Sequence, residues 1–380
     1  MNIFSAPNKN ARTAWLAKAI HHLYPIFQFS EASSSHSDLR SIIQPYLNDE
    51  RYHYAQYQFC FPNLIQPETF LNVRASFGES GLYGLDTHKA SATDPIADVQ
   101  LAYNCHLLNS TINSSASFHK ADVISSTDKL LLGQQLLIEG NSPTFKIKGE
   151  SSSLRYEIEV SLCSPVSWLA KSWLYDHLNC MTRYSGYIQT NSKHDEVQGT
   201  GTFDFVRSAL ASTPKSYARE LIGSLPVYFV TQHMLNLDAQ TQVIFYRMDL
   251  AGKPLCNTVL IRHSGGLCEV YDDVIFSVIQ YQPSPMQSPN GHDTLVAEQF
   301  EWTVYDNNGD VRLSVYGQLN SLPYTGYGQG YIAGFKFKAQ QLNSVSHGHG
   351  MMAHVDIMDP QNLDQKSFNE QYGGEFMPKT

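Results

Sequence analysis

The stretch YEIEVSL, residues 156–162, decides the fold class because its apolar and polar residues alternate without a break. The runs FEWTVY, residues 300–305, and YIAGFKFK, residues 331–338, follow the same period of two. Successive side chains of a β-strand point to opposite faces, so each run predicts a strand with one apolar face. One-sided strands are typical of antiparallel sheets. We therefore predict an all-β protein.

Turn-forming residues separate the alternating runs. DNNGD at residues 306–310, SGG at 264–266 and DLAGKP at 249–254 have the composition of hairpin turns, because Asn and Gly tolerate positive φ. Long helical patterns do not alternate with the strands, as a parallel sheet would require. The sequence thus predicts strands joined by antiparallel hairpins.

Length and composition fit a β-rich protein of two domains. Charged residues make up 16% of the chain, against roughly 25% in an average soluble domain. The 22 Tyr and 19 Phe residues suit pleated, half-buried surfaces. A chain of 380 residues exceeds the usual size of one domain.

Charge and hydropathy exclude two classes of partner. The net charge of −9, without any run of four basic residues, opposes nucleic-acid binding. No apolar run approaches the roughly 20 residues of a membrane span, so we expect no transmembrane segment. The N-terminus lacks the order of a signal peptide, which predicts a cytoplasmic protein.

The six cysteines are spread thinly and form no C-x-x-C motif. Free buried thiols in a reducing compartment are the expected state. A Cys163–Cys180 or a Cys256–Cys268 disulfide is the alternative if the protein is exported by another route.

The ends and the middle of the chain interrupt the strand pattern. Apolar residues recur at helical spacing within residues 10–24, and Asp38 can cap a short helix that runs through Ile43. Residues 207–222 break the alternation between the two halves. We predict a helical extension at 1–50, a first β domain at 51–207, a linker at 208–222, a second β domain at 223–359 and a tail at 360–380.

A weak internal repeat links the two halves. YSGYI at residues 184–188 precedes GTGTF at 199–203, and YGQL at 316–319 precedes GQGY at 328–331. Both copies read as a hairpin whose second strand carries glycines at positions i and i+2. Such glycines let a strand or ring approach closely, and barrels need them at tight bends. We predict two barrels of common origin.

These motifs resemble the two-domain lipocalin-like family that includes carotenoid 1,2-hydratases and lipocalin-like hydrolases. The resemblance is concentrated in residues 184–206 and 302–337, about a fifth of the chain. It implies two tandem antiparallel barrels of the calycin type, with a pocket for a hydrophobic molecule inside a barrel or between the two.

One family signature carries over onto Asp204. Members often show Val-x-Gly, an aromatic residue, an Asp five residues after the Gly, and then a polar pair. Val197 and Gly199 match, and Asp204 stands at the expected offset. Phe205 and Val206 replace the polar pair. Asp204 alternates with aromatic neighbours, so a cavity on its side would make it a candidate general acid.

Six aromatic residues are candidate ligand contacts. Residues 164–178 look too irregular for a strand and could form a short helix or a loop over a barrel mouth. The candidates are Trp168, Trp173 and Tyr175 from this segment, and Tyr184, Trp302 and Tyr331 from the strands around the repeat.

Other chemistry finds little support in the sequence. His347 and His349 share a strand face, but His354 has the opposite parity, so we expect no metal site. Nucleophile-elbow, phosphate-loop and dinucleotide signatures are absent, and no cofactor is expected.

Three functions remain open at this stage. The leading one is binding of a hydrophobic or amphiphilic small molecule in a barrel or between barrels. The second is a cofactor-independent lyase, isomerase or cyclase acting on a lipid-like or terpenoid substrate, with Asp204 and a nearby Tyr as acid and base. The third is a structural or interaction protein with closed barrels.

Overall fold

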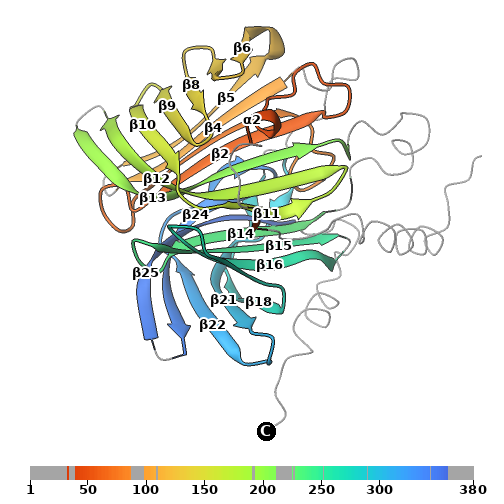
Figure 1. The fold of residues 1–380 in the computed structure, drawn as a ribbon, viewed down its shortest axis with the longest axis vertical. Helices are drawn as coiled ribbons and strands as arrows, with labels where there is room; N and C mark the ends of the chain where they lie inside the picture. The colour runs from red at the N-terminus through yellow and green to blue at the C-terminus, as the bar shows by residue number, and fades with distance from the viewer. Residues whose placement is uncertain are drawn as a thin grey trace, which may run out of the picture.

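The computed structural model describes residues 32–33, 39–86, 98–107, 110–190, 193–210, 225, 227–250, 252–288, 290–342 and 344–357. Most of these residues lie in two large, strongly curled antiparallel sheets that face each other (Figure 1). The structure confirms the all-β class and the two antiparallel barrels.

The first barrel is a sheet of 13 strands in the order β5-β4-β3-β2-β13-β12-β10-β9-β8-β7-β6, with β11 paired to β12 and β1 paired to β11. Its strands are β1 (Ala32–Ser33), β2 (Tyr54–Pro62), β3 (Phe70–Gly78), β4 (Asp98–Leu107), β5 (Ser110–His119), β6 (Val123–Ser126), β7 (Lys129–Leu132), β8 (Leu136–Asn141), β9 (Thr144–Glu150), β10 (Leu154–Leu162), β11 (Val166–Lys171), β12 (Tyr175–Thr190) and β13 (His194–Ser208). A single 3₁₀ turn, η1 (Lys120–Asp122), joins β5 to β6.

The second barrel is a sheet of 10 strands in the order β17-β16-β15-β14-β25-β24-β22-β21-β18, with β23 paired to β24. Its strands are β14 (Phe229–Asn236), β15 (Thr241–Leu250), β16 (Lys253–His263), β17 (Cys268–Tyr271), β18 (Val274–Tyr281), β21 (Ala297–Tyr305), β22 (Val311–Leu319), β23 (Tyr324–Tyr327), β24 (Gly330–Gln341) and β25 (Ser344–Asp356). A separate two-stranded ribbon pairs β19 (Met286–Gln287) with β20 (Asp293–Thr294).

The two barrels share one strand order. Strand β13 pairs with β2 and β12 in the first barrel, and β25 pairs with β14 and β24 in the second. The glycine pair Gly199 and Gly201 on β13 matches Gly348 and Gly350 on β25, because an aromatic ring covers the first glycine of each pair and a neighbouring strand's carbonyl crowds the second. The internal repeat is therefore a repeat of architecture.

The sequence located the repeated hairpin correctly only in the first half. There, residues 184–188 pair with residues 195–199 in the hairpin β12–β13. In the second half, Gly317 on β22 pairs with Phe337, whereas Gly330 pairs with Tyr327 of the short strand β23. The predicted pairing of residues 316–319 with 328–331 was wrong, because β23 is inserted between them.

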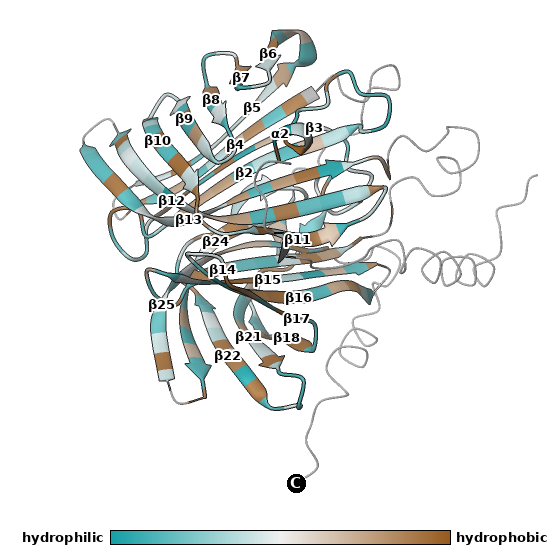
Figure 2. Ribbon diagram, viewed as in Figure 1, coloured by the Kyte–Doolittle hydropathy of each residue, from teal (hydrophilic) through white to brown (hydrophobic). Residues whose placement is uncertain are grey.

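Burial explains why some strands alternate and others do not. Strand β10 alternates between buried and exposed residues, whereas every residue of β2 is buried. One face of β2 lines the core of the first barrel, and its other face packs against the second barrel. Hydrophilic and hydrophobic residues form bands along the strands of both barrels (Figure 2).

Three aromatic-rich cores follow from this arrangement. The first barrel and the second barrel each enclose one, and a third lies between the barrels. The predicted short helix is α2 (Leu39–Ile42), and Leu39 and Ile43 are buried in the core of the first barrel. The predicted turns also form, since residues 249–254, 264–266 and 306–310 connect β15 to β16, β16 to β17 and β21 to β22.

One expectation about a local segment was wrong. Residues 164–178 form the strand β11 and the start of β12, although we predicted an irregular segment. A shift in register between Trp168 and Ala170 hides the alternation in the sequence. The predicted helix at residues 10–24, most of the linker and the C-terminal tail lie outside the described residues.

All six cysteines are free thiols. Burial raises the pKa of Cys60, Cys105 and Cys180 to about 12. Among the described residues, no helix is long and apolar enough to cross a membrane.

Candidate functional site

Asp204 lies in the layer between the two barrels. Its neighbours Phe203 and Phe205 on β13 belong to the core of the first barrel, so Asp204 points the other way, toward the second barrel. Only 1% of Asp204 is exposed. The side chain therefore faces neither the interior of its own barrel nor open water.

Four hydrogen bonds hold the Asp204 carboxylate. His177 Nε2 lies 2.9 Å from Oδ1, and Asn179 Nδ2 donates to the same oxygen over 2.6 Å. Gln232 of the second barrel donates to both carboxylate oxygens over 3.1 Å. Since an ionised carboxylate only accepts, the His177 Nε2 atom must carry a proton. The contacts join β12, β13 and β14 through one buried anion.

Arg262 on β16 brings a buried cation to the same layer. It donates to Oδ1 of Asn179, and to Oε1 of Gln242 over 3.1 Å from Nε and 2.7 Å from Nη2. Burial lowers the pKa of the Arg262 guanidinium. Asn179 bridges Arg262 and Asp204, so the two opposite charges are linked across the barrel interface.

The polar layer continues across the first barrel. Gln58 on β2 lies opposite Asp204, and Arg74 on β3 lies opposite Gln58. Arg74 donates to Gln56 Oε1 over 2.8 Å and to the carbonyl of Gly326 over 2.7 Å. The first barrel therefore presents amides and charges to a second-barrel face on which apolar residues surround Gln232 and Arg262.

Two atoms of this cluster lack hydrogen-bond partners among the described residues. They are Nδ1 of His177 and Nη1 of Arg262, and both residues are buried. Buried polar atoms in native proteins are normally satisfied by protein, water or ligand. In neutral His177 the free Nδ1 is an acceptor, whereas Arg262 Nη1 is a donor. We call Asp204, His177, Asn179, Gln232 and Arg262 the interface cluster.

Buried tyrosines lie in the same layer as the interface cluster. Tyr54, Tyr175, Tyr246 and Tyr327 belong to the core between the barrels. Burial raises the pKa of all four phenols. The His177 ring meets the Tyr246 ring edge-on, with centroids 5.0 Å apart. The layer thus combines aromatic surface with a few directed polar groups, as small-molecule sites do.

A known protein family matches most of this chain. Residues 77–370 match the family described as "Family of unknown function (DUF6670)". The chain belongs to this family.

Solved structures share the fold of this DUF6670 member at low sequence identity. A protein assigned as AttH from Nitrosomonas europaea matches with a TM-score of 0.55 and 10% identity, covering 82% of this chain and 94% of that chain. Kievitone hydratase from Nectria haematococca gives a TM-score of 0.54 and 8% identity, covering 86% and 97%. CghA with Sch210972 gives a TM-score of 0.50 and 9% identity, covering 80% and 88%. No curated protein sequence matches the chain.

The similarity to these solved structures concerns the fold. These neighbours are lipocalin-like barrel proteins, and the DUF6670 chain resembles them over most of its length. The resemblance drawn from the glycine motifs is therefore confirmed at the level of the fold.

The structure brings one predicted ligand residue to the interface cluster and separates the others. Tyr175 lies in the core between the barrels, near His177 with ring centroids 6.5 Å apart. Trp168 and Tyr184 belong to the core of the first barrel, where the Tyr184 hydroxyl donates to the Pro62 carbonyl over 2.8 Å.

The remaining aromatic candidates lie elsewhere in the DUF6670 fold. Trp173 is 59% exposed between β11 and β12. Trp302 and Tyr331 are fully buried in the core of the second barrel. The Tyr331 hydroxyl accepts a hydrogen bond from the Ala297 amide over 2.9 Å. Their role as ligand contacts stays a prediction.

The three histidines considered for a metal are dispersed. His347 is exposed, and His349 Nδ1 lies 2.6 Å from Asn320 Nδ2. His354 points into the second barrel. In the part of the chain that the structure describes, no group of three or more suitable side chains could hold a metal ion.

Sequence reasoning missed His177, Asn179, Gln232 and Arg262. A signal existed for the first two, since His177 and Asn179 alternate with the buried apolar residues Leu178 and Cys180 on β12. Arg262 is likewise the single charge in an apolar run on β16. Their convergence depends on contacts between barrels, which local patterns do not report.

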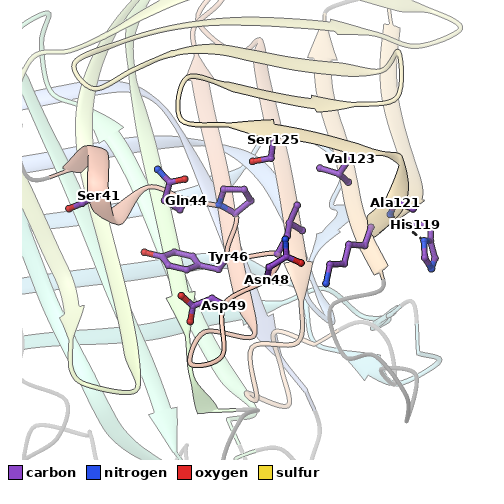
Figure 3. Close-up of a pocket in the computed structure, with 12 residues that line it drawn as sticks. Ser41, Gln44, Tyr46, Asn48, Asp49, His119, Ala121, Val123 and Ser125 are labelled. Atoms are coloured by element: carbon purple, nitrogen blue, oxygen red, sulfur yellow. Dashed lines mark hydrogen bonds between the residues drawn. The ribbon is translucent and has the colours of Figure 1, made fainter.

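A separate groove lies beside α2 at one end of the first barrel (Figure 3). Its volume is about 920 Å3, and its wall combines residues 41 and 44–49 with residues 119–121, 123 and 125. Tyr46 is fixed there because its hydroxyl donates to Ile42 and accepts from Arg207 over 2.6 Å. The groove is open and mainly polar, and none of the interface cluster lines it.

Proposed function

We propose that this protein binds a small amphiphilic molecule between its two barrels, with the polar end of the molecule at the interface cluster. The observation that carries the proposal is the buried Asp204–His177 pair, beside which His177 Nδ1 and Arg262 Nη1 have no hydrogen-bond partner among the described residues. A ligand hydroxyl group would donate to His177 Nδ1 or accept from Arg262 Nη1, and the tyrosines would contact the apolar part of the ligand.

The fold neighbours support a small-molecule role. One of them is a hydratase, and another was solved with Sch210972. The likeness concerns the fold alone, so the argument for binding rests on the chemistry of the interface cluster.

Native mass spectrometry of the full-length protein tests binding. We expect a co-purifying non-protein mass on the wild type that is lost from Asp204→Ala and from Gln232→Leu. The matched control is Asp195→Ala, because Asp195 lies on the same strand and its carboxylate forms a surface ion pair with Lys193, at 2.8 Å. Retention of the mass by Asp204→Ala and Gln232→Leu would contradict the proposal. So would a wild type that carries no such mass and fails to bind cis-parinaric acid, a fluorescent amphiphile.

A second candidate is a cofactor-independent lyase, isomerase or cyclase. It is favoured by the orientation of His177, since Asp204 holds Nε2 and leaves Nδ1 free to accept a proton. Imidazoles oriented by a carboxylate serve as general bases in many enzymes.

Deuterium exchange tests this second candidate. The protein is incubated in deuterated water with a panel of terpenoid ketones. We expect deuterium next to the carbonyl of at least one ketone, and loss of that exchange in His177→Gln. Equal exchange with both proteins, or none with either, would exclude His177 as the base in this chemistry.

A further inference from the structure

A chain of four polar side chains crosses the apolar core of the second barrel. Trp302 Nε1 donates to His233 Nδ1 over 3.0 Å. His233 Nε2 lies 2.8 Å from Thr231 Oγ1, and the same oxygen lies 2.8 Å from His354 Nδ1. All four side chains are completely buried. We call them the barrel-two relay.

The relay fixes which imidazole nitrogen carries each proton. An indole nitrogen can only donate, so His233 Nδ1 accepts and His233 Nε2 holds the ring proton. That proton goes to Thr231 Oγ1. We assign the Thr231 hydroxyl proton to His354 Nδ1, the other side-chain atom that the described residues place at hydrogen-bond distance from this oxygen. His354 is thereby set with its proton on Nε2. Burial lowers the pKa of His354 to about 3, so the ring stays neutral.

The last proton of the relay has no acceptor at hydrogen-bond distance. His354 Nε2 is buried without a hydrogen-bond partner among the described residues. The carboxylate oxygen Oδ2 of Asp356 lies 4.0 Å away and accepts from the Tyr281 hydroxyl over 2.7 Å. A donor and an acceptor at this separation can both bind one inserted oxygen, which accepts from the imidazole and donates to the carboxylate.

The surroundings select a neutral, partly apolar molecule. The rings of Phe229 and Tyr331 lie with their centroids 5.4 Å from that of His354. Arg247 is already paired to Asp249 through two hydrogen bonds of 2.9 and 2.8 Å. Asp356 adds a negative charge, and no Lys or Arg of the described residues forms an ion pair with it, so an anionic ligand is disfavoured.

From this geometry we propose that the second barrel holds its own binding site, in which His354 Nε2–H and the Asp356 carboxylate bind the hydroxyl group of a neutral aromatic or alkenyl alcohol. The site is distinct from the interface cluster, because the barrel-two relay points into the second barrel, whereas Asp204 points outward from the first barrel. Thr231 acts here as a positioning residue, since it reaches the ligand only through His354.

Nitrogen NMR of the full-length protein with 15N-labelled histidine tests the proposal. The probes are p-cresol and toluene, which differ by the hydroxyl oxygen, and His354→Gln assigns the signals. We expect a neutral His354 with its proton on Nε2, and a saturable shift of Nε2 with p-cresol and none with toluene. A proton on Nδ1 of His354, no saturable shift, or equal shifts with both probes would overturn the proposal.

Two variants of Thr231 separate positioning from packing. Thr231→Val keeps the shape and removes the hydroxyl, so the affinity for p-cresol should fall by about tenfold and the His354 tautomers should mix. Thr231→Ser keeps the hydroxyl and should retain both the tautomer and the affinity. Equal affinity in the wild type and Thr231→Val would contradict the relay. Asp204→Asn, which acts on the other site, should leave the His354 shift unchanged.

Discussion

The strand pair β2–β13 and the strand pair β14–β25 occupy equivalent places in the two barrels, yet only the second pair carries polar residues on its inward face. The inward positions held by Tyr57, Phe59, Phe203 and Phe205 in the first barrel are held by Thr231, His233, Met352 and His354 in the second. On the outward face Asp204 corresponds to Ala353, whereas Gln58 and Gln232 occupy equivalent positions.

This difference shows that one backbone architecture supports two separate polar sites. Buried polar groups are costly unless they are hydrogen-bonded. The inward face of the first pair is apolar, whereas the second pair carries hydrogen-bonded polar residues inward and Gln232 outward. The first pair places its polar residues against the second barrel, and the second pair adds a polar group in its own core.

The largest effect is expected when Asp204 is replaced by alanine, the residue at the equivalent position 353 of the second barrel. Asp204→Ala leaves His177, Asn179 and Gln232 without their acceptor and Arg262 without a nearby anion. We expect a loss of about 3–5 kcal/mol in the free energy of unfolding, measured by urea titration. Asp195→Ala on the same strand should cost less than about 1 kcal/mol. A loss below 1 kcal/mol for Asp204→Ala would show that the carboxylate is dispensable.

Exchanging the inward residues tests the other face. Phe205→His should cost about 3 kcal/mol, because it removes a core phenyl ring and buries an imidazole that has no relay to join. His354→Phe should cost only about 1 kcal/mol, since it replaces a relay member by an apolar ring of similar shape. Urea titration of both variants measures the asymmetry. Equal costs would mean that the relay does not stabilise His354.

The pH dependence of stability sharpens the comparison further. Burial raises the pKa of Asp356 from 3.8 to about 6. The folded state therefore binds more protons than the unfolded state between about pH 4 and 6, and this group makes stability fall as pH rises through that window. Between pH 4 and pH 7, the wild type should lose about 2–3 kcal/mol more of its free energy of unfolding than Asp356→Asn does. If the free energies of unfolding of the two proteins change equally with pH, Asp356 does not bind this extra proton in the folded state.

The glycines should behave alike in both barrels. A Cβ atom on Gly201 would lie 2.4 Å from the Cys60 carbonyl oxygen, and one on Gly350 would lie 2.5 Å from the Met234 carbonyl oxygen. Both contacts involve backbone, which cannot move aside easily. We expect Gly201→Ala and Gly350→Ala to cost about 2 kcal/mol each in thermal or urea unfolding. Unequal costs would indicate that the two barrels bend by different means.

The sequence reveals the strands and turns because these depend on neighbouring residues. Alternation in residues 156–162 and Asn and Gly in residues 306–310 report local geometry, and both are confirmed. The alternation around Asp204 also predicted that its side chain opposes those of Phe203 and Phe205. What lies beyond Asp204 is set by the second barrel, which the local pattern cannot report.

The failures have equally specific causes. The register shift between Trp168 and Ala170 concealed β11, and with it the alternation that continues to His177. The inserted strand β23 misdirected the repeat toward Gly328 and Gly330, although Gly348 and Gly350 are the true counterparts. Arg262 comes from a strand 83 residues away from Asn179, a separation that no short motif spans.

The most direct test of the account is a crystal structure of the protein as purified, at a resolution that separates water from larger molecules. We predict density for a non-protein molecule within about 3 Å of His177 Nδ1 and Arg262 Nη1, between the two barrels. If only water or protein atoms meet these two nitrogens, the proposal of a ligand site between the barrels is contradicted.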